Sequence, residues 1–408
     1  MHIRPYDPNK DKAAAIRIWN EVGWGGPTEN KCLETALEHA HSHVAEITGQ
    51  AECLVDTIPG DIDYLGEKLP LCAVLGVTTS HVARQGGVAG KLTAHSIAQE
   101  VAAGALMAGL GIFDQGYYNR LGFGNGTMEH QYLFDPRALM VPRLTRPPVR
   151  LGKDDIDRMH AARINRTRRH GSLSLHEAGI DRSEWAEHND AFALGFEDEH
   201  GELTHFFAMK GLGSETGPVS VRWAAWRTGQ QFMELMSMLH SLGDQLHAVR
   251  MQEPPGIQLF DLMRYPLRDI QRTSKSAHPT GVRAFPWWQL RMCNIEGCLA
   301  KTHLPAGEVR FNLELHDPIE DYLPADAPWR GESGQYIVTL GERSSAQRGA
   351  DPTLPTMKAG VGAFTRMWLG VRPAWALAIT DELQAPGELL ASLDSLLRLP
   401  QPHLDWMI

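Results

Sequence analysis

The chain has 408 residues, of which 43% are hydrophobic and 22% charged, and its formal net charge at pH 7 is −10. The chain is longer than one hydrophobic core usually organises, so two or three domains are expected. The composition is that of a globular protein. The negative charge argues against nucleic acid as a principal partner. No stretch approaches the roughly 18 uncharged apolar residues of a membrane span.

The chain start and the cysteines predict a cytoplasmic protein. Residues 1–7 lack the apolar core of a signal peptide and are expected to begin a first strand. Five cysteines, an odd and scattered number, argue against a disulfide framework. Cys293 and Cys298 lack zinc-finger spacing, and the alternating His39, His41 and His43 are better explained as a surface cluster. No metal site is expected.

The first third mixes helical and strand patterns. The expected elements are, in chain order, a helix through 13–19, a glycine-rich loop at 23–27, a helix through 33–40, and strands at 53–55 and 71–79. A helix after Gly87 carries Val88, Leu92 and Ile97, and is expected to end near residues 109–111. Ile112 and Phe113 could start a strand, and 128–134 is expected to be the last strand of this part.

The segment Arg84–Lys91 lies between that strand and that helix. Two consecutive glycines, Gly86 and Gly87, leave backbone amides uncrowded at a helix N-terminus, where the helix dipole also favours an anion. The segment matches neither the P-loop pattern nor the dinucleotide-binding glycine pattern. It can therefore be a diphosphate-binding loop, or simply a turn.

The middle third repeats the same order of elements. A proline-containing connector at 143–148 precedes a strand and charged helix within 149–170. An antiparallel pair at 191–196 and 203–210, a strand at 219–226 and a helix at 230–243 follow. This order suggests an internal duplication. Its glycine loop is reduced to one glycine in Arg227-Thr228-Gly229-Gln230, so we interpret this copy as structural.

The last third begins near residues 285–288. Strands are expected at 309–315 and 334–340, and helices at 360–369 and 387–397. The region could enclose a lipid cavity. The expected domain boundaries are 1–136, 143–284 and 285–408.

Two motifs carry a family resemblance. Arg84-x-x-Gly87-x-Ala89 resembles the pyrophosphate loop of the GNAT acyl-CoA N-acyltransferases, and Tyr118-x-Arg120-x-Gly122-Phe123-Gly124 resembles the block that closes the same domain. The whole layout resembles the bacterial Eis-type (enhanced intracellular survival) acetyltransferases. The resemblance implies an α+β protein: tandem GNAT-like mixed-sheet domains, then a sterol-carrier-protein-like α/β domain. It also implies a homo-oligomer.

The resemblance also implies site residues. Tyr118 would protonate the departing CoA thiolate, and the terminal carboxylate of Ile408 would be the general base. Trp24 is a substrate-contact candidate. The residues expected to bind acetyl-CoA are Val77, Thr79, Arg84, Gln85, Gly86, Gly87, Val88 and Ala89. Met407 stands where some aminoglycoside-acetylating members carry an acidic residue.

Two functions follow. One is transfer of an acetyl group from acetyl-CoA to a small-molecule or peptide amine. The other is non-catalytic binding of acyl-CoA or lipid by the last domain. The apolar tail Leu404–Ile408 favours the enzyme, because a lipid carrier has no use for a defined chain end whereas the acetyltransferase needs its carboxylate.

Overall fold

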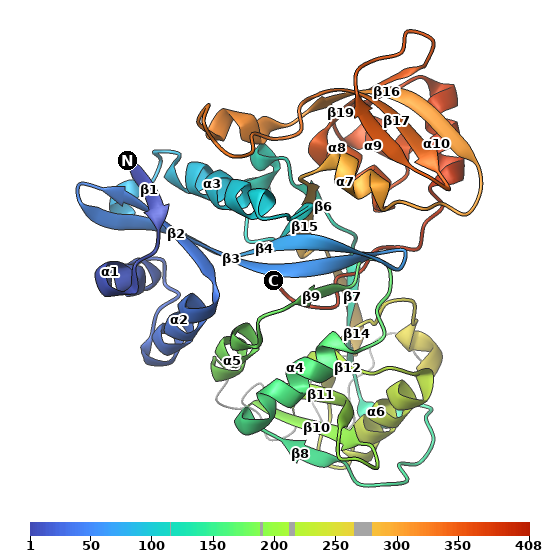
Figure 1. The fold of residues 1–408 in the computed structure, drawn as a ribbon. Helices are drawn as coiled ribbons and strands as arrows, with labels where there is room; N and C mark the ends of the chain where they lie inside the picture. The colour runs from blue at the N-terminus through green and yellow to red at the C-terminus, as the bar shows by residue number, and fades with distance from the viewer. Residues whose placement is uncertain (115, 188–190, 212–216, 265–279) are drawn as a thin grey trace. The chain divides into compact units, whose positions relative to one another are not determined.

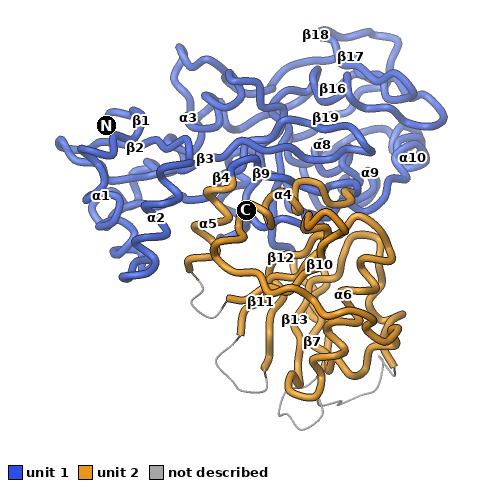
Figure 2. The backbone as a smooth tube through the Cα atoms, turned by 60° about the horizontal axis from the view of Figure 1, so that its bottom comes forward, with its two compact units in different colours: residues 1–127, 169–177, 286–408 blue, residues 128–168, 178–285 orange. Residues whose placement is uncertain are grey.

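The computed structural model describes residues 1–114, 116–187, 191–211, 217–264 and 280–408. Contacts group these residues into two compact units, coloured in Figure 2. Unit 1 is made of residues 1–127, 169–177 and 286–408, and unit 2 of residues 128–168 and 178–285. The first and last thirds of the chain thus share one unit.

Unit 1 is built on an eight-stranded mixed sheet (Figure 1). Its strands in sheet order are β1 (His2–Pro5), β2 (His41–Ile47), β3 (Gln50–Tyr64), β4 (Glu67–Thr79), β5 (Met107–Gly111), β15 (Trp288–Met292) and β6 (Gly124–Asn125), with β9 (Leu173–Leu175) pairing β3. β4 and β5 are parallel, and β15 is antiparallel to both β5 and β6. A strand from the last third therefore completes the sheet of the first third.

Helices cover both faces of this sheet. α1 (Pro8–Glu21) and α2 (Pro27–His39) pack Ala15, Leu33 and Leu37 against Leu54 of β3. α3 (Val88–Ala102) packs Leu92 and Ile97 against the opposite face. We call these the α1/α2 face and the α3 face. Side chains alternate along β3, so Leu54 points to the α1/α2 face and Val55 to the α3 face. The residues paired with them on neighbouring strands point to the same faces.

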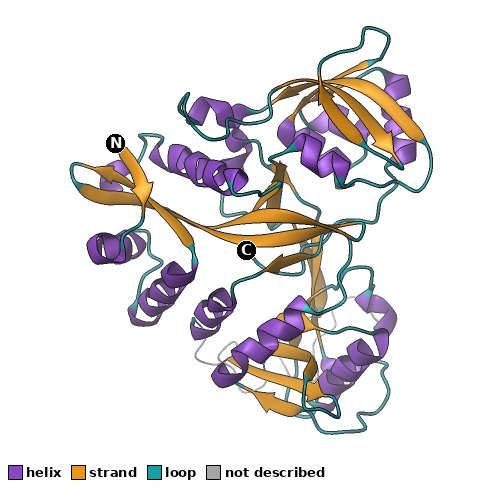
Figure 3. Ribbon diagram, viewed as in Figure 1, coloured by secondary structure: helices purple, strands orange, loops and turns teal. Residues whose placement is uncertain are grey.

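The rest of unit 1 surrounds a five-stranded sheet (Figure 3). Its strands in sheet order are β18 (Ser345–Arg348), β17 (Gly334–Gly341), β16 (Glu308–His316), β19 (Thr356–Gly360) and β20 (Leu383–Gln384). Its helices are α7 (Ile295–Ala300), α8 (Val361–Trp368), α9 (Ala374–Thr380) and α10 (Gly387–Leu396). The ring of Tyr64 in β3 stacks on that of Trp368 in α8, with the ring centroids 4.1 Å apart. This contact connects the first sheet to a helix that packs with the second sheet.

Unit 2 contains a seven-stranded sheet. Its strands in sheet order are β14 (Gly281–Phe285), β7 (Glu129–Phe134), β13 (Val249–Gln252), β12 (Val219–Ala225), β11 (Leu203–Gly211), β10 (Ala191–Glu197) and β8 (Val149–Leu151). The helices are α4 (Ile156–Ile164), α5 (Ala178–Ala186) and α6 (Gly229–Ser241). The predicted strands and helices of the middle third are therefore present, in the predicted order.

Three local predictions were wrong. The helix after Gly87 ends at Ala102, because Gly104 adopts the left-handed conformation (φ 112°) that terminates helices, and residues 109 and 111 lie within β5. Ile112 and Phe113 follow β5 rather than start it. The run 128–134 forms β7 of unit 2, where it pairs with β13 and β14 instead of closing the first sheet.

In the described part of the chain, no helix combines the length and apolar character needed to cross a membrane.

Candidate active site

Strands β4 and β5 separate part-way along their length. Their register runs from Leu71 opposite Met107 to Val74 opposite Leu110 and stops there. An irregularity follows at once: β3 pairs Thr57 with Val74 but Asp56 with Gly76, so Leu75 is an extra residue. Beyond it, Val77 and Thr79 are half-buried, and β5 no longer pairs with this stretch of β4. We call this gap the β4–β5 opening.

The glycine loop follows β4 directly. Arg84, Gln85, Gly86 and Gly87 are all exposed, and Gln85 and Gly87 have left-handed backbones (φ 65° and 67°). Gly87 is the N-cap of α3 and supplies no side-chain cap, so no side chain of the N-cap covers the amides of the first turn. Val88 is buried and Ala89 half-buried at the helix start. The loop presents uncapped amides with Arg84 and Lys91 near them in sequence, an arrangement that suits an anion.

Tyr118 begins the short 3-10 helix η2 (Tyr118–Leu121) and is buried on the α3 face. Its ring lies 4.9 Å from that of Tyr117. Burial is the main cause that raises the pKa of Tyr118 well above its usual value, and neighbouring Tyr117, Asp114 and Cys53 add to this. Burial also raises the pKa of Tyr117 to about 12. Both phenols are thus protonated at neutral pH and can donate a proton.

Side chains of β15 hold the turn that carries Tyr118. The buried guanidinium of Arg291 donates to the carbonyl of Leu121 and to Asp317. Gln289 Nε2 donates to Asn119 Oδ1 at 3.1 Å and to Asn125 Oδ1 at 2.6 Å. Since β15 also pairs with β5, the turn is fixed relative to the β4–β5 opening.

The chain end lies against β5 on the α1/α2 face. A Cβ on Gly111 would collide with a terminal carboxylate oxygen of Ile408, and a Cβ on Gly109 would lie 3.2 Å from its Cδ1. The tail is anchored upstream: Leu404 and Trp406 are buried, and Asp405 accepts hydrogen bonds from Ser172 Oγ and Leu173 N, each at 3.2 Å. The glycines of β5 are therefore the surface on which the chain end packs.

Trp24 belongs to an aromatic cluster on unit 1. Its ring lies 5.5 Å from that of Trp19 and 5.5 Å from that of Phe113, edge to face in both cases. Phe113 follows β5 and is 76% exposed, while Trp19 and Trp24 are half-buried. The cluster thus joins α1, the loop after it and the end of β5 into one aromatic surface.

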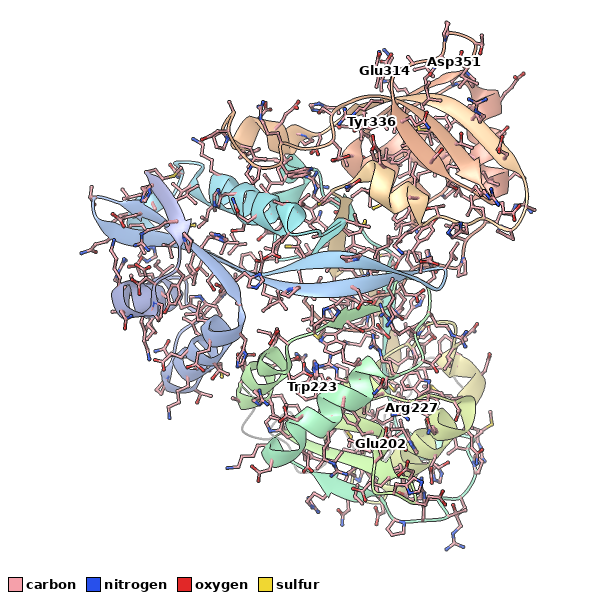
Figure 4. The ribbon with its side chains drawn as sticks, viewed as in Figure 1. Glu202, Trp223, Arg227, Glu314, Tyr336 and Asp351 are labelled. Atoms are coloured by element: carbon pink, nitrogen blue, oxygen red, sulfur yellow. The ribbon has the colours of Figure 1, made fainter. Side chains whose placement is uncertain are left out.

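The corresponding position in unit 2 is built differently. Thr228 caps α6 by accepting from Gln231 N at 3.2 Å, and Gln231 Oε1 accepts from Thr228 N at 3.2 Å. Arg227 pairs with Glu202, both labelled in Figure 4. Glu197, Asp198 and Glu199 line the adjoining pocket. The Thr228 side chain thus occupies the N-terminus of α6, and the nearby carboxylates make its surroundings negative. Both disfavour the binding of a diphosphate.

Sequence reasoning missed Arg291 and Gln289, because strand β15 is distant in sequence from the turn that it supports. It also did not single out Asp56, a buried carboxylate of β3, although its place next to the apolar run Cys53–Val55 was a visible signal. The predicted residues fall into two groups. The first group lies on the α3 face: Val77, Tyr118, Val88 and Ala89 belong to its core, Thr79 contacts Cys53, and the exposed residues 84–87 connect β4 to α3. Trp24 and Ile408 form the second group, on the α1/α2 side.

Sequence comparison identifies the first third. Residues 2–126 match the acetyltransferase (GNAT) domain family. This range includes the glycine loop, both strands of the opening and the turn with Tyr118. No curated protein sequence gave a significant match.

Solved structures share the fold of the whole chain. A probable N-acyltransferase from Enterococcus faecalis V583 is 17% identical with a TM-score of 0.76, covering 100% of this chain and 99% of that one. A GCN5-related N-acetyltransferase from Anabaena variabilis is 13% identical with a TM-score of 0.77, and Eis1 from Mycobacterium abscessus is 16% identical with a TM-score of 0.74; each covers 100% of both chains. The expected resemblance to Eis-type proteins is thus confirmed at the level of the fold.

Proposed function

Because residues 2–126 make this chain an acetyltransferase with a GNAT domain, we propose that it transfers the acetyl group of acetyl-CoA to an amine by direct attack on the thioester. The observation that carries the proposal is the β4–β5 opening, with an uncapped helix N-terminus at one end and the Ile408 carboxylate beside it on β5. Donor, acceptor and proton-transfer groups can meet there.

The proposed donor site uses the loop and β4. Amides at the start of α3, around Gly86–Ala89, bind the pyrophosphate, with Arg84 and Gln85 beside them. Backbone groups at Val77 and Thr79 hold the thioester and its developing oxyanion, since β5 does not pair with this part of β4. Holding the two reactants together supplies much of the acceleration.

The proposed reaction needs two proton transfers. The amine nitrogen attacks the acetyl carbon, the carbon–sulfur bond breaks, and Tyr118 gives its proton to the departing thiolate. The Ile408 carboxylate accepts the proton that the amine loses. A free thiol has a pKa of about 8.5, below that of Tyr118, so this transfer is uphill and must accompany cleavage. Trp24 packs against the acceptor.

The remaining parts have proposed roles as well. We infer that unit 2 contains a GNAT-like copy without a cofactor site, and that residues 285–408 form a sterol-carrier-protein-like domain whose sheet pairs β16 antiparallel to β17 and parallel to β19. The expected boundaries 1–136 and 143–284 remain predictions, as does a homo-oligomer. The five cysteines are all buried, and the cytoplasmic location remains a prediction.

One screen tests the function. Untagged protein is incubated with acetyl-CoA and polyamines, aminoglycosides, lysine peptides or arylalkylamines, and free thiol is followed. Amine-dependent thiol release with a mono-acetylated product is expected for at least one class. Thiol release that no amine accelerates, with acyl-CoA or lipid still bound, would instead support the non-catalytic alternative.

A further inference from the structure

Asp56 is a buried carboxylate that has no counter-ion among the residues that the structure describes. It lies in β3, is 3% exposed, and shares the α1/α2 face with Leu54. Its Oδ1 has no hydrogen-bond partner of good geometry in the described part of the chain. An isolated charge at such a position is costly, and native proteins rarely keep one without a partner.

Other buried carboxylates of unit 1 are partnered, among them Asp63 of β3, which accepts from Gly66 N at 2.9 Å. Asp11 accepts from Arg4 Nη1 at 2.6 Å and Nη2 at 2.9 Å. Glu52 pairs with Arg17 at 3.1 Å, and Glu100 accepts from Thr57 at 2.8 Å. Asp56 thus differs from these buried carboxylates of α1, β3 and α3, which are partnered within the fold.

Other unpartnered polar atoms surround Asp56. Ser42 of β2 and Gly76 of β4 are paired with Asp56 on its two neighbouring strands. A Cβ at Gly76 would lie 2.9 Å from Asp56 Oδ2 and 3.7 Å from Trp19 Cζ2, so the carboxylate lies over the glycine beside the indole. Ser42 Oγ, Thr78 Oγ1 and Trp19 Nε1 are also buried without a partner of good geometry among the described residues.

This cluster lies at the β4–β5 opening. Gly76 follows the last paired residue, Val74, by two positions and precedes Val77. Ala73 pairs with Gly109, and because Leu75 is an extra residue, Gly76 returns to the face of Ala73, as Gly111 does to that of Gly109. Gly76 and Gly111 therefore share one face, on the two sides of the opening. Asp56 lies over Gly76, and the Ile408 carboxylate lies over Gly111. Trp19 lies beside Gly76, Phe113 follows Gly111 by two residues, and the ring of Trp24 contacts both aromatic rings.

We propose that Asp56 binds the ammonium group of a cationic acceptor on the α1/α2 face, so that the substrate class is a protonated alkylamine held between two carboxylates. The inference rests on the proposed acetyl transfer. The ammonium supplies the positive charge that Asp56 lacks, and its hydrogen atoms can satisfy Asp56 Oδ1 and the Ser42 hydroxyl. The aromatic cluster receives the apolar part of the amine. One proton leaves the ammonium through the Ile408 carboxylate to solvent, and the neutral nitrogen attacks the acetyl carbon. The proton lost on amide formation then passes to the same carboxylate, while Tyr118 protonates the departing thiolate.

The ionisation of Asp56 fits this role. Burial raises its pKa to about 7, and the Ser42 hydroxyl opposes part of the rise. Tyr6 is a titratable neighbour of Asp56: burial, and after it the charges of Asp11 and Asp56, raise its pKa to about 12, so it is neutral at physiological pH. The site can therefore ionise when a cation enters it.

The test compares acceptors of different charge. Wild type, Asp56→Asn and Asp11→Asn are assayed with the fastest cationic amine of the screen and with methoxyamine, which is neutral at pH 7.5. For Asp56→Asn, kcat/KM for the cationic amine should fall at least about 30-fold, mainly through KM, since charged hydrogen bonds are the strong ones. Methoxyamine turnover and acetyl-CoA affinity should change less than about threefold. Asp11→Asn should not discriminate between the acceptors.

A second variant and a pH profile complete the test. Gly76→Ala, where the new Cβ would press on Asp56 Oδ2, should show the same selective loss. In wild type, kcat/KM for the cationic amine should rise as pH increases through about 7, and this step should be absent in Asp56→Asn. Equal losses for both acceptors, or a cationic kcat/KM within threefold of wild type, would refute the role of Asp56 while leaving acetyl transfer intact. No amine turnover by wild type would refute both.

Discussion

The guanidinium of Arg291 and the carboxylate of Asp317 form an ion pair 2.5 Å apart, and neither side chain has exposed surface. Asp317 also accepts from the amides of Ile319 and Glu332, while Arg291 donates to the carbonyl of Leu121. The pair therefore links β15, the segment after β16 and the turn that carries Tyr118.

Loss of one partner of this pair should be costly. Asp317→Ala leaves a buried guanidinium uncompensated, so the free energy of unfolding should fall by about 3–5 kcal/mol. Urea denaturation followed by circular dichroism measures this change. The double variant Arg291→Met/Asp317→Leu should recover part of the loss. A double variant less stable than Asp317→Ala would show that the guanidinium is needed for its other hydrogen bonds.

Gly87→Asp should abolish acetyl-CoA binding. The substitution adds a carboxylate at the N-cap of α3, where it can accept hydrogen bonds from the first-turn amides and repel the pyrophosphate. In addition, the left-handed φ of 67° at Gly87 is strained for a residue that has a side chain. Calorimetry with acetyl-CoA checks the affinity. Gly104→Asp, at another left-handed glycine after α3, is the matched control and should retain binding. Unchanged affinity in Gly87→Asp would move the pyrophosphate elsewhere.

Tyr118→Phe should lower kcat by about 100-fold or more, the usual scale for a positioned general acid. KM for acetyl-CoA should change little, because the ring that packs against Tyr117 and Phe123 remains. Steady-state thiol release gives both constants. Tyr117→Phe is the control, and a larger loss there than in Tyr118→Phe would exchange the roles of the two tyrosines.

Changes at the chain end should cost activity far more than stability. Residues added after Ile408 replace its carboxylate by an amide, and removal of Met407 and Ile408 withdraws it, while the buried anchors Leu404 and Trp406 remain. Gly111→Ala should act similarly, because its Cβ would displace the carboxylate. Thiol-release rates and melting temperatures are compared on tag-free proteins. Full activity of the extended protein would rule out the carboxylate as general base.

Asp56 and Asp11 should affect the pH dependence of stability in opposite directions. The folded-state pKa of Asp56 is raised to about 7, so the native state binds its proton more tightly and this group makes the protein less stable as pH rises from about 4 to 7. Asp56→Asn should therefore be more stable than wild type at pH 8, by at most about 4 kcal/mol, and nearly equal at pH 4.

The Asp11 control follows from its salt bridge. Burial opposes ionisation, but Arg4 and the Asp7 amide lower the pKa of Asp11. Its stabilising contribution is present above the unfolded pKa and is lost as pH falls through the lower folded value. Asp11→Asn should be destabilised at pH 8, and less so in acid. Melting temperatures across pH 4–8 for both variants provide the measurement; a less stable Asp56→Asn at pH 8 would contradict the raised pKa.

The sequence was sufficient where a local pattern decides the structure. The glycine pair at 86–87 predicted a turn into α3, and apolar periodicity predicted α1, α2, α6 and the β10–β11 pair. It was insufficient where distant segments meet. Nothing near Trp288–Met292 indicates pairing with β5, and β7 has the same alternation whichever sheet it joins. The sequence did not indicate a role for Asp56, because the role depends on its position over Gly76 of the neighbouring strand. Pairing between strands cannot be read from the residues around Asp56 alone.

Strand β15 also has a consequence for biosynthesis and protein dissection. The facing edges of β5 and β6 stay unpaired until the ribosome has produced Trp288–Met292, so the acetyltransferase module matures late and through contacts of high sequence separation. A fragment cut at residue 127 would expose two strand edges that invite aggregation. Evolution can therefore elaborate the segments between β6 and β15, but it cannot exchange the last third for another module without leaving this sheet incomplete.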